Sequence, residues 1–218
     1  MKEVIGFLKR LKRNNNRDWF QAHKDEYVAA KEKVDNLTNS LIALVAEEDA
    51  EALRLTAAQC TYRIYRDTRF SLDKTPYKTH FGIFINPPYG KKSERNGYYF
   101  HIEPGNCFMA AGTIGLPPKK LKAVRQSIYD EIDEYLSIVE SLEFKKYFPT
   151  PGEDFLKTAP KGFDKNWEHI YYLRPKNFCV CCPVADDYFD TLGNDIREAI
   201  HQMHRYNRFV NFPIEDME

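Results

Sequence analysis

Apolar residues in the first part of the chain recur at helical spacing. Residues 2–12 carry apolar side chains on one helical face with lysines and arginines opposite, which predicts a short amphipathic helix. Asparagines at 14–16 favour a turn. After them, apolar positions at spacings of three, four and seven predict one long helix that ends near residue 45. Residues 1–50 are therefore expected to be a helical N-terminal part.

Beyond residue 55 the pattern changes to the composition and alternation typical of β-strands. The predicted strands are residues 62–67, 79–86, 97–103 and 107–114. Short links between sequential strands indicate antiparallel pairing, because a parallel pair needs a crossover of about a dozen residues or more. We expect residues 58–116 to hold the main strands.

The rest of the chain returns to helical periodicity with one further strand. Pro117 and Pro118 are well placed to begin a helix over residues 117–140. Residues 170–212 are predicted to hold a last strand at 177–184, with Pro183 at its end or at a sheet edge, and a helix at 186–204. The tail after this helix is expected to pack back through Phe209 and Phe212.

Together these elements predict one α+β domain over residues 1–218. Its sheet is expected to be antiparallel or mixed, with about five strands flanked by N-terminal, middle and C-terminal helices. We find no internal repeat and no linker long enough to divide domains. A length of 218 residues with 43% hydrophobic content is sufficient for a real core and argues against disorder.

Charge and cysteine content narrow the class of protein. The chain has 32 basic and 32 acidic residues, which argues against a surface wholly committed to nucleic acid or an anionic membrane. No apolar run approaches the roughly 18 residues of a spanning helix. Lysines and arginines interrupt the apolar positions at the start, so it lacks the core of a secretory signal. Five cysteines, an odd number, indicate reduced thiols. We therefore expect a cytoplasmic protein.

The stretch from Thr61 to His80 concentrates cations. It holds five arginines and lysines but only two acids, among four aromatic residues. Such a loop is suited to bind a phosphate or carboxylate. The residues predicted to bind a small anionic ligand are Arg63, Arg66, Arg69, Ser71, Lys74, Lys78, Tyr99 and His101.

Tyr99 and His101 are included because of strand alternation. With Glu103 they share one strand face, opposite Tyr98 and its apolar neighbours. Tyr, His and Glu beside an arginine-rich loop supply the parts for acid–base work, although such a face is more often the solvated side of an antiparallel sheet. The sequence does not decide whether the protein is an enzyme.

Two other functions stay open for the same residues. In the first, Asp67 and Asp73 neutralise the loop internally, and the charges are braces in a structural or protein-interaction module. In the second and weaker one, aromatics interleaved with cations stack on bases in a nucleic-acid accessory protein; zero net charge and the lack of a binding signature weigh against it.

No motif calls for a metal or a cofactor. Cys179, Cys181 and Cys182 form a C-V-C-C segment without a second pair, so we interpret the cysteines as core thiols. His201 and His204 lie three apart on the last helix but have no third ligand with a motif. Nucleotide-binding and nucleophile motifs are missing as well.

Several motifs of this chain resemble a known family. They are N-N-N-R-D-W-F at 14–20, R-I-Y-R-D-T-R-F-S-L-D-K-T-P-Y-K-T-H at 63–80, G-Y-Y-F-H-I-E-P at 97–104, A-G at 111–112 and P-K-G-F-D at 160–164. In these segments the chain is similar to the uncharacterised bacterial and fungal family named domain of unknown function 2461. Where family members often carry a His-Pro pair after P-K-G-F-D, this chain reads K-N-W-E-H. The resemblance implies an α+β fold and a cytoplasmic protein, and it implies no catalytic residues.

Overall fold

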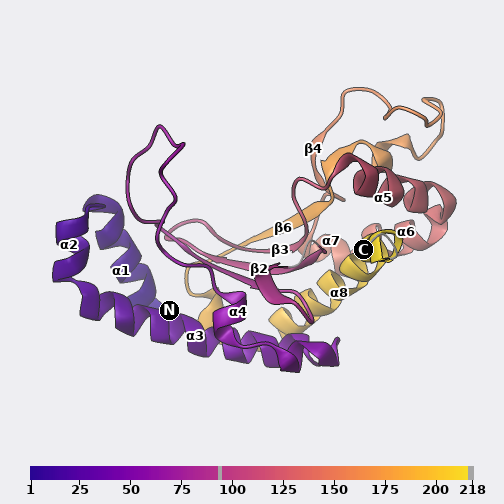
Figure 1. The fold of residues 1–218 in the computed structure, drawn as a ribbon. Coiled ribbons are helices and arrows are strands. Elements are labelled where there is room, and N and C mark those ends of the chain that lie inside the picture. Colours follow the sequence, from indigo (N-terminus) through magenta and orange to yellow (C-terminus); the bar gives the residue numbers. More distant parts are fainter. Residues whose placement is uncertain (93–94, 216–218) are drawn as a thin grey trace. The chain divides into compact units, whose positions relative to one another are not determined.

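The computed structural model describes residues 1–92 and 95–215 (Figure 1). Contacts within the chain divide these residues into two compact units that interleave along the sequence. Unit 1 comprises Met1–Lys92, Tyr99–Met109 and Pro183–Gly193. The described residues of unit 2 are 95–98, 110–182 and 194–215. The α+β class predicted from the sequence is confirmed, and the expectation of one domain stays a prediction.

Unit 1 begins with helices. They are α1 (Lys2–Arg13), α2 (Arg17–Ala22), α3 (Lys24–Val45) and α4 (Ala57–Cys60), with short 3-10 helices η1 (Ala50–Arg54), η2 (Gly90–Lys92) and η4 (Tyr188–Asp190). The apolar face predicted for the first helix is buried. The side chain of Asn16 caps α2 by accepting a hydrogen bond from the Trp19 N–H at 2.9 Å.

The single long helix predicted up to residue 45 is in fact α2 and α3, separated at His23. The His23 backbone leaves helical geometry at φ −115° and ψ 25°. Its imidazole Nδ1 lies 2.8 Å from the Trp19 carbonyl oxygen, and the two rings stack at 4.1 Å. Local side-chain interactions of this kind compete with helix continuation, which apolar spacing alone does not register.

Four strands form an antiparallel sheet in the order β1-β2-β3-β6, so the predicted sheet type is confirmed. The strands are β1 (Phe81–Ile85), β2 (Gly97–Ile102), β3 (Cys107–Gly112) and β6 (Cys179–Val184). Pro183 lies on the edge strand β6, as predicted, and edge strands are where sheets tolerate a residue without an N–H.

The strand predicted at 62–67 does not form. Its backbone runs beside residues 76–83 but makes only isolated bridges, from Thr61 to Ile83 and from Tyr65 to Tyr77. Just beyond the second bridge, toward the loop tip, the Arg66 N–H donates to the Pro76 carbonyl at 2.9 Å. Pro76 has no N–H with which to continue the ladder, so the pairing stays irregular.

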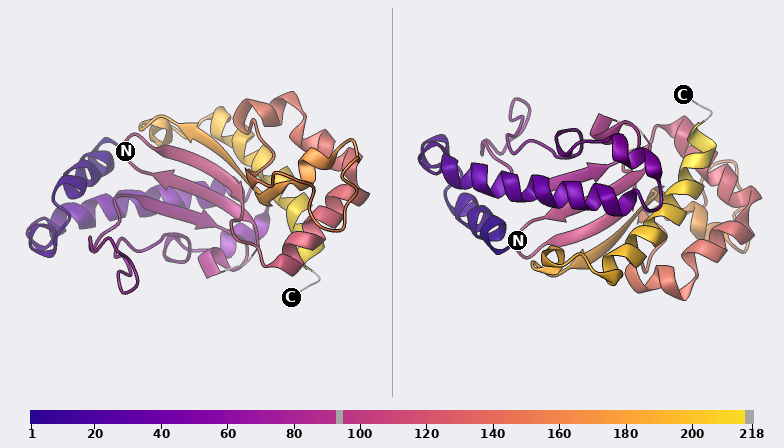
Figure 2. Two further views of the ribbon diagram at one scale, coloured as in Figure 1. Left: turned by 90° about the horizontal axis from the view of Figure 1, so that it is seen from above. Right: turned by 90° about the horizontal axis from the view of Figure 1, so that it is seen from below.

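The strands of unit 1 have one apolar face and one mixed face. Alternate residues such as Phe81, Ile83, Phe100 and Ile102 are buried to 0–1% exposure. Helix α3 packs on β1, and the two views in Figure 2 show the strands in front of α3 from above and behind it from below. The residues that alternate with these buried ones lie on the opposite side of the strands, which we call the open face. They are His80, Gly82, Phe84, Tyr99, His101 and Phe108.

Unit 2 contains the remaining elements. They are α5 (Pro118–Asp130), α6 (Ile132–Val139), α7 (Leu142–Tyr147), the antiparallel strands β4 (Glu153–Phe155) and β5 (Pro175–Asn177), the 3-10 helix η3 (Ile170–Leu173) and α8 (Asn194–Glu215). The middle helix predicted at 117–140 breaks at Glu131, whose φ of −118° separates α5 from α6.

The last helix differs in extent from its prediction. Helix α8 begins eight residues later than expected and continues through the predicted tail, including Pro213. Phe209 is buried as expected, whereas Phe212 is 72% exposed and the prediction for it is wrong. The continued helix directs Phe212 away from the buried stripe that includes Phe209 and Val210. Within the described residues, no helix has the length and apolarity needed to cross a bilayer.

Candidate functional site

The stretch from Thr61 to His80, which we call the basic loop, is held at its tip by one of its own acidic residues, Asp73. Arg66 contacts the Asp73 carboxylate at 2.5 Å and also donates to the Thr75 hydroxyl. Asp73 in turn accepts hydrogen bonds from the Thr75 N–H at 2.9 Å and hydroxyl at 3.0 Å. The Thr75 N–H first, and then the Arg66 guanidinium, lower the pKa of Asp73 to about 2.

The other cations at the tip are engaged in the same way. Arg69 makes a two-pronged contact with Asp67, at 3.0 Å from Nε and 2.7 Å from Nη2. Lys74 donates to the Thr68 carbonyl at 2.9 Å, and the Ser71 hydroxyl lies 3.5 Å from Arg66. Four of the predicted ligand-binding residues, Arg66, Arg69, Ser71 and Lys74, therefore contact the loop itself.

Arg63 and Lys78, at the base of the loop, differ from these cations in their contacts. Among the described residues neither forms a hydrogen bond or an ion pair through its side chain. The Lys78 ammonium lies 5.3 Å from the centroid of the Tyr62 ring. Burial, and then the charge of Arg63, lower the pKa of Lys78.

The base of the loop is fixed by the turn before α2. The Asn15 side chain donates to the Tyr77 carbonyl at 2.9 Å and accepts from the Tyr77 N–H at 3.1 Å. Tyr77 is buried and stacks on Phe20 with ring centroids 4.0 Å apart. Tyr77 is therefore part of the core, so it does not belong to a base-stacking platform of the kind that the aromatic pattern suggested.

On the open face, His101 lies between a phenol and a carboxylate. The Tyr99 hydroxyl is 2.9 Å from Nδ1 of His101, and the Glu103 Oε2 is 3.3 Å from its Nε2. Burial, and then the charges of Tyr62 and Glu103, raise the pKa of Tyr99 to about 12. Strand alternation predicted this shared face, and the three side chains do meet on it.

Glu103 is fixed by further hydrogen bonds. Thr79 donates to Oε1 at 3.1 Å, and Asn106 donates to Oε2 at 3.0 Å. Burial raises the pKa of Glu103, but the hydrogen bonds from Asn106, His101 and Thr79 outweigh it, so the pKa lies below its ordinary value. The group is a carboxylate at neutral pH, held on both oxygens.

A second histidine completes the cluster. The His80 ring lies 4.5 Å from that of His101, which stacks on Phe108 at the same distance. Burial, and then the neighbouring His101, lower the pKa of His80 to about 4, and burial also lowers that of His101. The His80 imidazole is therefore neutral at pH 7, and burial favours the neutral form of His101.

Gly82 makes room for this arrangement. A Cβ on Gly82 would lie 2.8 Å from the Tyr99 hydroxyl oxygen and 3.2 Å from the Tyr62 ring. The Tyr99 side chain therefore extends across β1 only because position 82 has no side chain. This contact places the tyrosine hydroxyl near His101.

Sequence reasoning did not include His80, Thr79, Asn106 or Gly82 in the site. For His80 a signal existed, because alternation through positions 80, 82 and 84 places it on the face opposite Phe81 and Ile83. Asn106 lies in a turn, where no periodicity predicts direction, and Thr79 precedes β1 although the predicted strand included it. We call His80, His101 and Glu103, with Tyr99, Thr79 and Asn106, the open-face cluster; all of it lies in unit 1.

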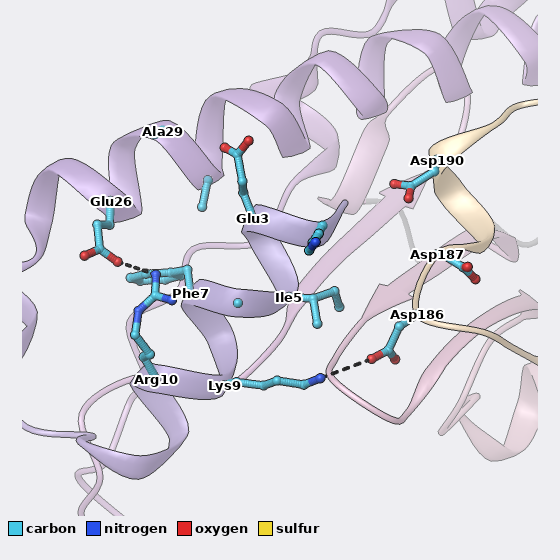
Figure 3. Close-up of a pocket in the computed structure, with 13 residues that line it drawn as sticks. Glu3, Ile5, Phe7, Lys9, Arg10, Glu26, Ala29, Asp186, Asp187 and Asp190 are labelled. Atoms are coloured by element: carbon cyan, nitrogen blue, oxygen red, sulfur yellow. Dashed lines mark hydrogen bonds and ion pairs between the residues drawn. The ribbon is translucent and has the colours of Figure 1, made fainter.

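A separate groove of about 840 Å³ lies along α1 in unit 1 (Figure 3). Two ion pairs lie within it: Arg10 contacts Glu26 at 2.5 Å, and Lys9 lies 3.9 Å from Asp186. Its lining shares no residue with the open-face cluster. The groove therefore adds nothing to the predicted ligand site.

The cysteines behave as expected for reduced thiols. All five are free; Cys60, Cys107 and Cys179 are buried, and Cys181 and Cys182 are half-buried. In the described part of the chain, the one grouping of three or more potential ligands within reach of one ion is His80, His101 and Glu103. No cysteine belongs to it.

Fold and site together define an α+β protein with a polar, histidine-containing cluster on the open face of an antiparallel sheet. The chain belongs to the family described as conserved hypothetical protein (DUF2461), whose model matches residues 3–212. The resemblance seen in the sequence motifs is thereby confirmed. Comparisons with curated proteins and with solved structures gave no match.

Proposed function

We propose that this protein binds a small phosphate- or carboxylate-bearing ligand at the base of the basic loop, next to the open face. The observation that carries the proposal is the placement of Arg63 and Lys78. The other cations of the loop contact acids, hydroxyls or carbonyls of the loop itself, whereas these two contact none in the described residues.

Repulsion between the charges of Arg63 and Lys78 supports the same assignment. Arg63 and Lys78 are close enough for one to lower the pKa of the other, and the Lys78 ammonium is partly desolvated over the Tyr62 ring. A bound anion would relieve both costs, because it supplies the counter-charge that the loop does not. Tyr99 and His101 lie on the adjoining face and are the uncharged members of the predicted set.

The alternative, in which the loop charges are internal braces, is favoured for part of the same loop. Arg66 with Asp73 and Arg69 with Asp67 rigidify the tip, which is otherwise exposed. We therefore divide the predicted residues into two sets. The ligand-binding set is Arg63, Lys78, Tyr99 and His101, and the bracing set is Arg66, Arg69, Ser71 and Lys74.

Titration calorimetry on chelator-treated protein tests this division, with inorganic phosphate and succinate as the two probes. Lys78→Met and Arg63→Gln remove the cations of the ligand-binding set. Lys74→Met and Arg69→Gln make the same chemical changes in the bracing set and are matched controls. We expect each ligand-set variant to weaken the better probe about 10-fold, as for loss of one charge-assisted hydrogen bond.

The controls should change the affinity less than about twofold, since exposed ion pairs contribute little. Failure of both probes to bind the wild-type protein, or an equal loss in all four variants, would overturn the proposal. Binding of succinate but not phosphate would retain the site and assign it to carboxylates.

A further inference from the structure

We infer that His80, His101 and Glu103 form a binding site for one divalent transition-metal ion of the Zn²⁺ type. This inference shares Tyr99 and His101 with the ligand-binding set but uses neither of its cations, and it does not rest on the proposed function. It starts from their separation: one ligand atom from each residue lies within 4.8 Å of the other two.

That spacing is close to what coordination requires. Ligands at about 2.1 Å from a tetrahedral ion lie about 3.4 Å from one another. His101 Nε2 and Glu103 Oε2 are 3.3 Å apart, so this pair already has the correct separation. The His80 nitrogen has to approach them by about 1.4 Å at most, and a rotation of its ring supplies such a movement. In the described residues the His80 ring makes no hydrogen bond, so none has to be broken for this movement.

The donor set selects the class of ion. Two imidazoles and one carboxylate suit Zn²⁺ and its first-row neighbours, whereas Ca²⁺ and Mg²⁺ prefer oxygen ligands alone. Three protein ligands leave at least one position for water or an anion, as in catalytic rather than structural sites.

The residues that contact His101 and Glu103 are arranged like those that usually hydrogen-bond to metal ligands. Ligating histidines usually donate their second N–H to an oxygen, and ligating carboxylates are themselves hydrogen-bonded. The Tyr99 hydroxyl lies 2.9 Å from His101 Nδ1, the nitrogen that faces away from Glu103. Thr79 and Asn106 each donate to a different oxygen of Glu103.

Metal binding requires one change at His101. When the ring carries a proton on Nε2, it donates that proton in a hydrogen bond to Glu103. For Nε2 to coordinate, the proton has to move to Nδ1, where the Tyr99 oxygen accepts it. Because its hydroxyl can accept a hydrogen bond from Nδ1–H, Tyr99 supports the metal-binding tautomer.

The test is a Zn²⁺ titration of chelator-treated full-length protein in competition with a chromophoric chelator, followed by a Co²⁺ absorption spectrum. We expect one ion per chain and visible Co²⁺ bands of nitrogen and oxygen ligation. His80→Gln and Glu103→Gln should each weaken Zn²⁺ more than 100-fold. Tyr99→Phe should weaken it about 10- to 100-fold, as is usual for groups behind the ligands.

His201→Gln, on the exposed face of α8, is the matched control and should leave the affinity unchanged. His80 is the preferred position for the test, since no hydrogen bond is lost on its replacement. Thermal unfolding of each metal-free variant checks that it folds. The inference is overturned if His80→Gln binds Zn²⁺ like the wild type, if His201→Gln loses as much affinity, or if a thiolate-to-Co²⁺ charge-transfer band shows that cysteines hold the ion.

Discussion

Tyr99 and His101, two residues apart on β2, form a hydrogen bond at 2.9 Å between the phenol oxygen and Nδ1. Side chains at this spacing share a strand face, but contact between them requires that one lean along the strand. Tyr99 does so in the space left by Gly82 on the neighbouring strand β1. A residue without a side chain on one strand thus sets the orientation of an imidazole on the next.

Gly82→Ala should displace the Tyr99 hydroxyl from His101. A Cβ at 2.8 Å from the hydroxyl oxygen and 3.2 Å from the Tyr62 ring leaves no room for the present position of the tyrosine. We expect weaker Zn²⁺ binding by about 10-fold, comparable with Tyr99→Phe. Competition titration measures it. If Gly82→Ala weakens Zn²⁺ further in a Tyr99→Phe background, the effect does not act through the hydroxyl.

Asp73 should titrate about two pH units below an ordinary aspartate, at about 2 instead of 3.8. A lowered pKa in the folded state means that the carboxylate contributes stability above about pH 4 and that this contribution is lost as the pH falls toward 2. Carboxyl-detected NMR measures the midpoint. Arg66→Gln should raise it only part of the way, because the Thr75 N–H, the larger cause, remains. A midpoint near 3.8 in the wild type would contradict the loop geometry.

The thiols should react slowly with alkylating agents at pH 8. Burial raises the pKa of Cys60 and of Cys181 to about 11. Lys91 opposes the shift at Cys60. The charges of Glu153 and Cys182 add to the shift at Cys181. Only the thiolate is nucleophilic. Peptide-resolved mass spectrometry after iodoacetamide labelling should show rates at both positions that still rise at pH 10. A plateau near pH 9, as expected for unfolded protein, would contradict this.

Phe100→Ala should destabilise the protein strongly. Phe100 is fully buried and meets Phe189 edge to face, with ring centroids 6.2 Å apart. Loss of a buried phenylalanine costs about 3–5 kcal/mol of unfolding free energy. Urea unfolding measures this, and Phe70→Ala is the matched control. Phe70 is 97% exposed at the loop tip, so its replacement should change stability by no more than about 0.5 kcal/mol. Equal losses in the two variants would show that the core is placed wrongly.

Much of the fold was predictable because periodicity depends on local geometry. The amphipathic first helix, the strands at positions 81, 97 and 107 and the edge position of Pro183 follow from spacing and from proline chemistry. The errors occur where tertiary or side-chain contacts override spacing. His23 divides a helix by bonding to Trp19, and the irregular pairing beside Pro76 replaces a predicted strand.

The sequence by itself determined the class of the fold, the family, and the face on which Tyr99, His101 and Glu103 meet, since strand alternation depends only on the backbone. Two matters were decided by the tertiary structure alone. One is the division of the basic loop, where Asp67 and Asp73 engage Arg69 and Arg66 and leave out Arg63 and Lys78. The other is the meeting of His80 with His101. Both depend on which side chains the folded backbone brings within a few ångströms, and distance along the chain does not encode that.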